Sequence, residues 1–173
     1  MTDSREWQGL IMDPEPYCDE HRAMLAESHY LALPPPGCLF AVAVRAAAPG
    51  LFGPEGAGPL RGVCIVGRPV ARMLPQDGTM GEVTRLVLLD GLPYATASAL
   101  LRRVADVARE RGMASLISYH DRTRHTGTIY RKAGFRKDGA TAPSGNGWAT
   151  RNRPNSADSG ATSKRRWRLD LLG

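Results

Sequence analysis

An amphipathic helix enclosed between two apolar strands constrains this chain more than any other feature. The helix is expected from Tyr94 to Arg111, with apolar residues along one face and charged residues along the other. An apolar strand is expected over 80–89 before it, and another over 115–119 after it. A helix that joins two strands must cross over a face of the sheet, so this segment predicts an α/β layered domain.

The N-terminal half predicts one more helix and two more strands. Helical spacing of apolar residues indicates a helix over 17–28. Apolar runs over 38–44 and 61–67 predict strands, and the Gly- and Pro-rich residues 47–60 predict a connector between them. The spacing suggests a long hairpin.

The C-terminal part predicts a short helix and a final strand. The short helix is expected to end at Gly134, a residue suited to the left-handed conformation after a helix. Residues 138–163 are rich in Gly, Ser, Asn and Thr and predict loop. Polar and apolar residues alternate over 164–171, which is typical of a strand. At 173 residues the whole set fits one domain.

The net charge of +6 is concentrated in the last third of the chain. Residues 1–123 hold 12 Lys and Arg against 14 Asp and Glu, whereas residues 124–173 hold 11 against 3. Clustered Lys and Arg are typical of proteins that contact phosphates, so the asymmetry favours a nucleic-acid partner. The alternative is a basic tail that only aids solubility.

The three cysteines predict neither a metal knuckle nor a disulfide framework, because they are far apart and odd in number. Cys38 and Cys64 lie in apolar runs and are expected to be buried, while Cys18 has no obvious activating neighbour. The sequence shows neither a membrane-spanning run nor a signal peptide. We therefore expect a soluble protein of the cytoplasm.

The strand, turn and helix between residues 115 and 135 form the first candidate site. His120, Asp121 and His125 are expected in a polar turn after the strand, and Tyr130 one turn before the helix ends. Backbone donors and titratable side chains converge where strands end beside helix starts. This segment is therefore the expected centre of the chemistry, with His120 and His125 more typical of turn or DNA-facing residues than of ligands.

The element order and two motifs resemble the GNAT acyltransferase fold. The motifs are Glu82-Val-Thr-Arg-Leu86 before the long helix and Tyr130-Arg-Lys-Ala-Gly-Phe135 at the end of the short one. The resemblance implies a single domain over 1–173, with a mixed central sheet flanked by helices and a basic, loop-rich part over about 138–173. It also implies that Tyr130 acts as general acid toward a departing thiolate.

A narrower resemblance is to the phage Mom-type DNA-modification proteins, a divergent GNAT-like group. The matching pieces include Ser28-His29-Tyr30, Ser118-Tyr-His-Asp121, Gly127-Thr-Ile-Tyr130 and Ser163-Lys-Arg-Arg-Trp167. The resemblance implies transfer of an acyl-derived group, of carbamoylmethyl or acetamido type, to N6 of adenine in phage DNA. Such a modification would protect the DNA from host restriction, and the protein would act in the cytoplasm of the host bacterium.

The expected catalytic residues are His29, Tyr30, Asp121, Tyr130 and Arg85. Asp121 or His29 would take a proton from the acceptor, and Tyr130 would give one to the leaving group. Arg85 would bind a carboxylate or phosphate. The alternatives are structural: a helix cap for His29, a turn for Asp121, core packing for Tyr130 and an ion pair for Arg85. The resemblance also implies an iron-type metal, with His29 and Asp121 as candidate ligands.

The donor is the least determined partner. The turn over 90–97 lacks the Gln/Arg-x-x-Gly-x-Gly/Ala loop that holds the CoA pyrophosphate in ordinary GNAT enzymes. An unidentified acyl or aminoacyl donor is therefore expected, and acetyl-CoA is the less favoured cofactor. The start of the following helix is still expected to bind the donor, with Tyr94, Thr96 and Ser98 as the candidate residues.

Double-stranded DNA is the expected macromolecular partner, with the target adenine flipped out of the duplex. The predicted contacts combine cations with an aromatic plane: Arg124, Trp148, Arg151, Arg153, Lys164, Arg165 and Arg166. Trp167 is expected to pack inward, and a homodimer is compatible with the sequence. Two other functions stay open, a CoA-dependent N-acetyltransferase of a small molecule or protein and a non-enzymatic DNA-binding phage protein.

Overall fold

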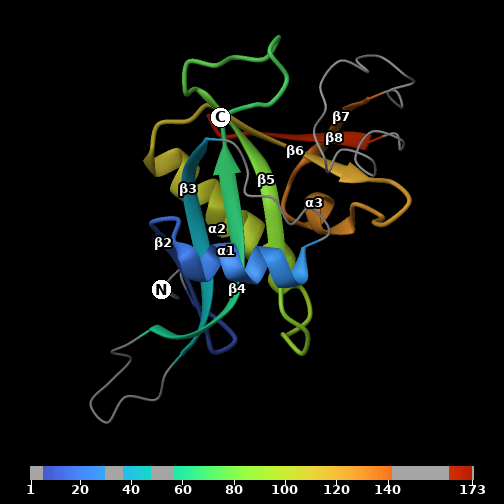
Figure 1. Cartoon of the computed structure of the whole chain (residues 1–173). Helices are drawn as coiled ribbons and strands as arrows, with labels where there is room; N and C mark the ends of the chain where they lie inside the picture. Colours follow the sequence, from blue (N-terminus) through green and yellow to red (C-terminus); the bar gives the residue numbers. More distant parts are fainter. Residues whose placement is uncertain (1–5, 30–36, 48–56, 142–163, 173) are drawn as a thin grey trace.

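The computed structural model describes residues 6–29, 37–47, 57–141 and 164–172, which form one mixed sheet with helices on both faces (Figure 1). The strands are β1 (Glu6–Trp7), β2 (Leu10–Glu15), β3 (Cys38–Ala47), β4 (Ala57–Gly67), β5 (Met80–Leu88), β6 (Ser115–Asp121), β7 (Arg136–Ala140) and β8 (Lys164–Asp170). The helices are α1 (Asp19–Ser28), α2 (Thr96–Glu110) and α3 (Thr128–Lys132). The predicted single-domain α/β fold is confirmed.

The strands are ordered β1-β2-β3-β4-β5-β6-β8-β7 across the sheet. Strands β5 and β6 are parallel, and every other neighbouring pair of described strands is antiparallel. Parallel neighbours need a crossover connection, which α2 supplies. The expectation that the long helix crosses the sheet is therefore confirmed.

Helix α2 covers one face of the sheet. Its apolar residues recur three or four positions apart, so Leu100, Leu101 and Val104 lie on one side and are fully buried. They share a core with Val42 of β3 and Leu116 of β6. Burial of one such side chain stabilises the fold by roughly 1.5–3 kcal/mol.

Helix α1 covers the opposite face, in front of the sheet in Figure 1. Met24 and Leu25 pack there against Ala41 of β3, Ile65 of β4 and Val87 of β5. The central strands are therefore buried on both faces, which explains their nearly continuous apolar sequences. No helix in the described ranges is both long and apolar enough to cross a membrane.

Several boundaries differ from the sequence-based expectation. His120 and Asp121 are the last residues of β6 rather than part of a turn. Ala47 pairs with Ala57, so both ends of the expected connector 47–60 belong to strands. Part of the expected loop 138–163 is strand as well, because β7 runs from Arg136 to Ala140 along the edge of the sheet. Strands β1, β2 and β7 depend on pairing with a neighbour, which local sequence does not report.

Candidate functional site

The central feature of the site is the point where β5 and β6 part. The two strands pair over four residues only, from Met80 opposite Ser115 to Val83 opposite Ser118. Beyond that point β6 continues beside β8, and β5 continues beside β4. The outer edge of β5 after Val83 therefore has no strand partner in the described sheet, which leaves backbone donors and acceptors for a ligand.

A β-bulge marks the same point. Val83 lies opposite Val66 and Arg85 opposite Ile65, so Thr84 is the extra residue in β5. Bulges bend a strand and re-aim its side chains, and they are frequent beside active sites. The Arg85 side chain stays at the bulge and donates a 2.7 Å hydrogen bond to the carbonyl of Thr84.

Tyr130 of α3 reaches this junction through Ser118. Its hydroxyl oxygen is 2.9 Å from Oγ of Ser118, and that Oγ is 3.3 Å from the carbonyl oxygen of Val83. Tyr130 is 7% exposed, and its ring stacks on Trp167 and forms a T-shaped contact with Phe135. The hydroxyl is therefore held in place beside the last residues that pair β5 with β6.

Glu82 is a site residue to which the sequence analysis gave no role. It is 7% exposed, and burial raises the pKa of its carboxyl group. The backbone N–H of Val70 donates a 2.9 Å hydrogen bond to this carboxyl group. That hydrogen bond and the charges of Lys164 and Arg85 act to lower its pKa, against the larger effect of burial. A carboxylate within the apolar strand Met80–Leu88 was the available signal. Buried carboxyl groups with a raised pKa are candidate proton acceptors.

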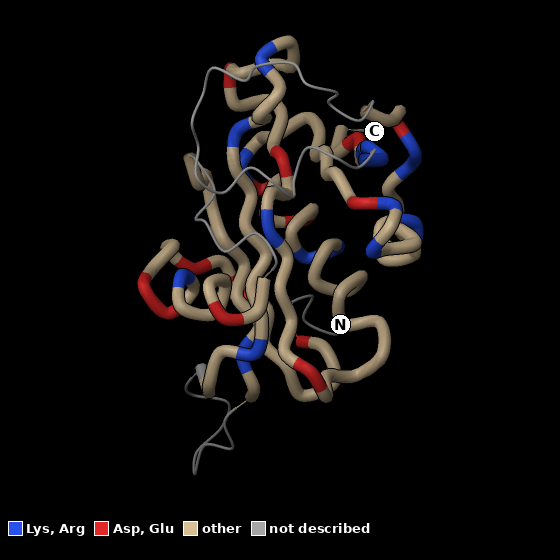
Figure 2. The backbone as a smooth tube through the Cα atoms, turned by 45° about the vertical axis from the view of Figure 1, so that its right-hand side comes forward, with Lys and Arg blue, Asp and Glu red and all other residues tan. Residues whose placement is uncertain are grey.

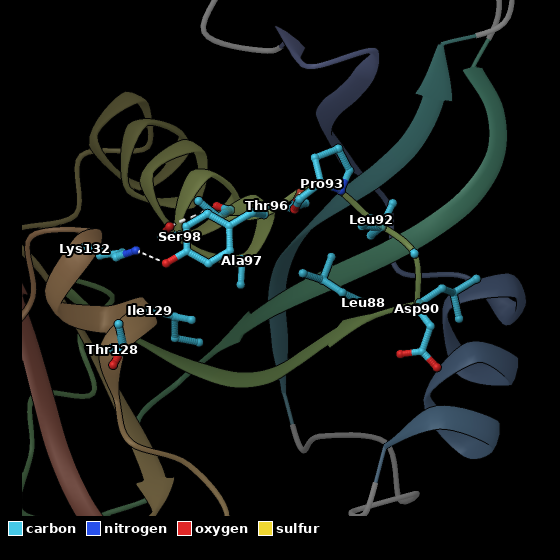
Figure 3. A pocket seen from close by; sticks show the side chains of 14 residues that line it. Leu88, Asp90, Leu92, Pro93, Thr96, Ala97, Ser98, Thr128, Ile129 and Lys132 are labelled. Carbon is cyan, nitrogen blue, oxygen red and sulfur yellow. Dashed lines mark hydrogen bonds between the residues drawn. The ribbon is translucent and has the colours of Figure 1, made fainter.

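A cavity of about 490 Å³ opens at the C-terminal end of β5 (Figure 3). It is lined by the turn after β5, the first turn of α2 and one side of α3. Lys132 of α3 and Asp90 are the charged residues in its wall, and Nζ of Lys132 donates a hydrogen bond to the hydroxyl of the exposed Tyr94. The Lys132 ammonium lowers the pKa of that hydroxyl.

The three residues expected to bind a donor all line this cavity: Tyr94, Thr96 and Ser98. The hydroxyls of Thr96 and Ser98 donate to the carbonyls of Pro93 and Ala95, so they fix the turn that forms the cavity wall. Ala95 lies in the left-handed region, with φ of 69°. Its place in Leu92-x-x-Ala95-x-Ala97 corresponds to the first glycine of the missing CoA loop. The backbone therefore keeps a left-handed residue here, at a cost of about 1 kcal/mol.

Known structures share this arrangement of strands and helices. An IAA acetyltransferase from Bacillus cereus superposes with a TM-score of 0.59 at 14% identity, over 94% of this chain and 99% of that one. An acetyltransferase from Bacillus subtilis, solved in complex with CoA, gives 0.58 at 16% identity over 94% and 99%. A ribosomal-protein-alanine N-acetyltransferase from Escherichia coli gives 0.60 at 11% identity over 94% of both chains. The fold is that of the GNAT acetyltransferases. No known family model matches the sequence, and no curated protein does.

The comparisons support the GNAT fold and give no support to the narrower Mom-type resemblance.

Two other predicted catalytic residues, His29 and Asp121, lie on different elements of the fold. His29 caps the C-terminus of α1, where its N–H donates to the carbonyl of Leu25, on the face away from α2. Asp121 is buried at the end of β6 and accepts hydrogen bonds from the N–H and hydroxyl of Thr123. Tyr30 lies outside the described residues.

The described residues contain no group of three His, Cys, Asp or Glu side chains placed to hold a metal ion. Asp121 is engaged by Thr123 in a turn, and Nε of Arg124 is 3.7 Å from its second oxygen. The expectation of iron at His29 and Asp121 therefore gains no support from the described part of the GNAT fold.

Trp167 packs inward as predicted and is 3% exposed. Its indole N–H donates a 2.6 Å hydrogen bond to Nδ1 of His120, a ring that also stacks on Tyr130. Burial lowers the pKa of His120, as do the charges of His125 and Arg165. His120 is thus held neutral, with its proton on Nε2, and braces Tyr130 within the GNAT fold.

Arg124, predicted to contact nucleic acid, lies in the turn after β6, with its Nε 3.7 Å from Oδ2 of Asp121. The other predicted nucleic-acid residues fall into two groups. Lys164, Arg165 and Arg166 lie on β8, and Figure 2 shows basic segments around the end of the chain marked C. Arg166 forms an ion pair with Asp138, whereas Lys164 and Arg165 form none with described residues. Trp148, Arg151 and Arg153 lie outside the described ranges.

Proposed function

We propose that this protein is a CoA-dependent N-acyltransferase, which moves an acyl group from a CoA thioester to an amine. The observation that carries the proposal is the parting of β5 from β6 beside Tyr130, with a cavity at the C-terminal end of β5. The fold supports it, since a neighbour with this fold was solved with CoA. This proposal replaces the expectation that acetyl-CoA is the less favoured donor.

The cavity and the open edge of β5 suit the two ends of such a donor. The unpartnered edge after Val83 offers backbone groups to the amides of a pantetheine arm, much as a strand edge receives another strand. The first turn of α2 carries N–H groups without helical partners and no acidic residue, and Lys132 adds a positive charge. These features favour binding of phosphate groups in the cavity.

The junction residues supply the proton transfers. As the amine nitrogen bonds to the thioester carbonyl carbon, it must lose a proton, and the carbon–sulfur bond must break. Glu82 would accept that proton, because burial brings the pKa of its carboxyl group closer to neutral pH. Tyr130 would donate a proton to the leaving sulfur, with Ser118 fixing its hydroxyl.

The test is calorimetric titration with acetyl-CoA, followed by an assay for amine-dependent release of CoA. We expect Lys132→Ala to weaken binding about tenfold, as expected for loss of one charge-assisted contact. Arg131→Ala is the matched control, because this exposed neighbour on α3 does not line the cavity. Absence of binding at millimolar acetyl-CoA and CoA would overturn the proposal.

A second candidate places the acceptor amine on DNA, at N6 of adenine. The observation that favours it is the cationic surface around β8, where Lys164 and Arg165 form no ion pair with described residues. Nucleosides from plasmid made in cells that produce the protein should then contain a heavier deoxyadenosine. Unmodified deoxyadenosine, with soluble and CoA-binding protein, would assign the acceptor to a small molecule or a protein instead.

A further inference from the structure

The start of α1 brings a thiol, an imidazole and a carboxylate into contact. Sγ of the exposed Cys18 is 3.5 Å from Nδ1 of His21, one turn along the chain. His21 is fully buried, and its Nε2 is 3.4 Å from Oε2 of Glu15 at the end of β2. A thiol beside an imidazole that faces a carboxylate is an arrangement that activates sulfur as a nucleophile.

The hydrogen bonds fix the protonation of the imidazole. The backbone N–H of Cys18 donates to Nδ1 of His21 at 3.3 Å, so Nδ1 carries a lone pair and the proton is on Nε2. At 3.4 Å the contact with Glu15 is longer than an ordinary hydrogen bond, so the carboxylate acts on the ring mainly by its charge. The Cys18 thiol and the Cys18 N–H both face this single lone pair. Transfer of the thiol proton to Nδ1 therefore requires the long hydrogen bond from the Cys18 N–H to break, and Glu15 would stabilise the imidazolium that results.

The surrounding charges keep this group in place. Nε and Nη2 of Arg45 on β3 are 2.5 and 2.8 Å from the two oxygens of Glu15. The same guanidinium binds Glu20 on α1 at 2.7 Å. The pKa of Glu15 is lowered, mainly by the hydrogen bond from Arg45, so the carboxylate stays ionised. Burial lowers the pKa of His21, which keeps the ring neutral, whereas the charge of Glu15 acts in the opposite direction and favours proton uptake.

We propose that Cys18 is a modification site that forms mixed disulfides with low-molecular-weight disulfides. The Cys18 proton passes to Nδ1 of His21, and the thiolate attacks one sulfur of the disulfide. A new sulfur–sulfur bond forms at Cys18 as the old one breaks, and the departing thiolate takes up a proton. Cys18 is the N-cap residue of α1 and is exposed, so a disulfide in solution can reach its sulfur.

The other two cysteines provide a control within the same molecule. Burial raises the pKa of the Cys38 thiol, and it raises the pKa of the fully buried Cys64 thiol further. Neither is expected to react with a disulfide while the chain is folded. The proposal does not depend on the proposed acyl transfer, since α1 and α2 lie on opposite faces of the sheet.

The experiment is incubation of the folded protein with oxidised glutathione at neutral pH, with peptide mass spectrometry at timed intervals. We expect glutathione on Cys18 alone, about tenfold faster than in His21→Gln. Glutamine at this third helical position can keep the hydrogen bond to the N-cap N–H while removing the base. Glu15→Gln should slow the reaction less, and Cys18→Ser should abolish it.

A second measurement tests the proposal with the wild-type chain alone, so it does not depend on whether a variant folds. The wild-type chain unfolded in urea exposes all three thiols without His21 or helix contacts. Cys18 of the folded protein should react faster than Cys18 of the unfolded chain under the same conditions. Equal or slower reaction of folded Cys18, or first reaction at Cys38, would overturn the proposal.

Discussion

Tyr130 and Glu82 are the two residues of the strand junction to which we assign proton transfers. Both are buried, but they are held differently: Tyr130 through Ser118, and Glu82 through the backbone N–H of Val70. The position of Tyr130 at the end of a helix was predictable, because a helix-end motif surrounds it. Glu82 was not, since its burial and raised pKa depend on how β4, β5 and their connection pack. A single acidic residue in an apolar strand sequence does not show whether its carboxyl group faces solvent.

Tyr130→Phe should remove the proton donor while leaving the ring stacked on Trp167. We expect kcat for acyl transfer to fall by about 10²–10⁴, the usual contribution of general acid catalysis, with little change in the Kd of acetyl-CoA. Steady-state kinetics and calorimetry on the same preparation measure the two quantities. A loss of donor affinity with unchanged kcat would show that the hydroxyl serves binding alone.

Glu82→Gln should change how stability depends on pH. The pKa of Glu82 is raised in the folded state. The protonated side chain therefore contributes to the free energy of unfolding at pH values below its unfolded pKa of about 4.3, and this contribution is lost as pH rises through its folded pKa. The variant carries no charge, so its free energy of unfolding relative to wild type should increase as pH rises above about 4. Urea unfolding at several pH values tests this, and a flat difference would contradict it.

At the scale of elements, the turn into α3 shows how tightly a helix can be placed. Gly127 has φ of 76°, and a Cβ there would lie 2.5 Å from Cζ2 of Trp167 and 2.9 Å from Cε1 of His120. The helix therefore begins directly against the indole, which positions Tyr130.

Periodicity predicted α2 within two residues at each end, because its apolar face is regular. The edge strand β7 was missed, because its residues are mostly exposed and polar.

Gly127→Ala should destabilise the fold by about 2–4 kcal/mol, combining left-handed strain with overpacking against Trp167. Gly112→Ala is the matched control, because Gly112 has φ of 75° and nothing within 4 Å of its added Cβ. The control should lose only about 1 kcal/mol. Chemical denaturation measures both, and equal losses would show that the contact with Trp167 relaxes.

At the scale of the molecule, the sheet consists of β1–β5 and β6–β8–β7, which pair directly through four residues of β5 and β6. The crossover helix made the α/β class predictable, since only a layered sheet accommodates it. The narrower DNA-modification hypothesis depended on short motifs, and short motifs do not specify an acceptor. The turn beside the cavity also needed the structure, because Ala95 adopts a left-handed conformation there without glycine.

Acetyl-CoA should stabilise the molecule at the outer edge of β5, where that strand has no partner beyond Val83 in the described sheet. At a concentration of about 100 Kd, the free energy of unfolding should rise by about 2.7 kcal/mol. Amide hydrogen exchange should slow in residues 84–88 and in the turn before α2, and change least in β1 and β2. Uniform protection, or protection confined to β1 and β2, would place the ligand elsewhere.

The pairing of β6 with β8 has a consequence for biosynthesis. Ser118 pairs with Trp167, and His120 receives the indole hydrogen bond, yet β8 leaves the ribosome after every other described strand. Until then, β6 can pair only with β5, over four residues, and its other edge is open to unwanted partners. A nascent chain stalled before residue 164 should therefore need chaperone protection that the finished chain does not.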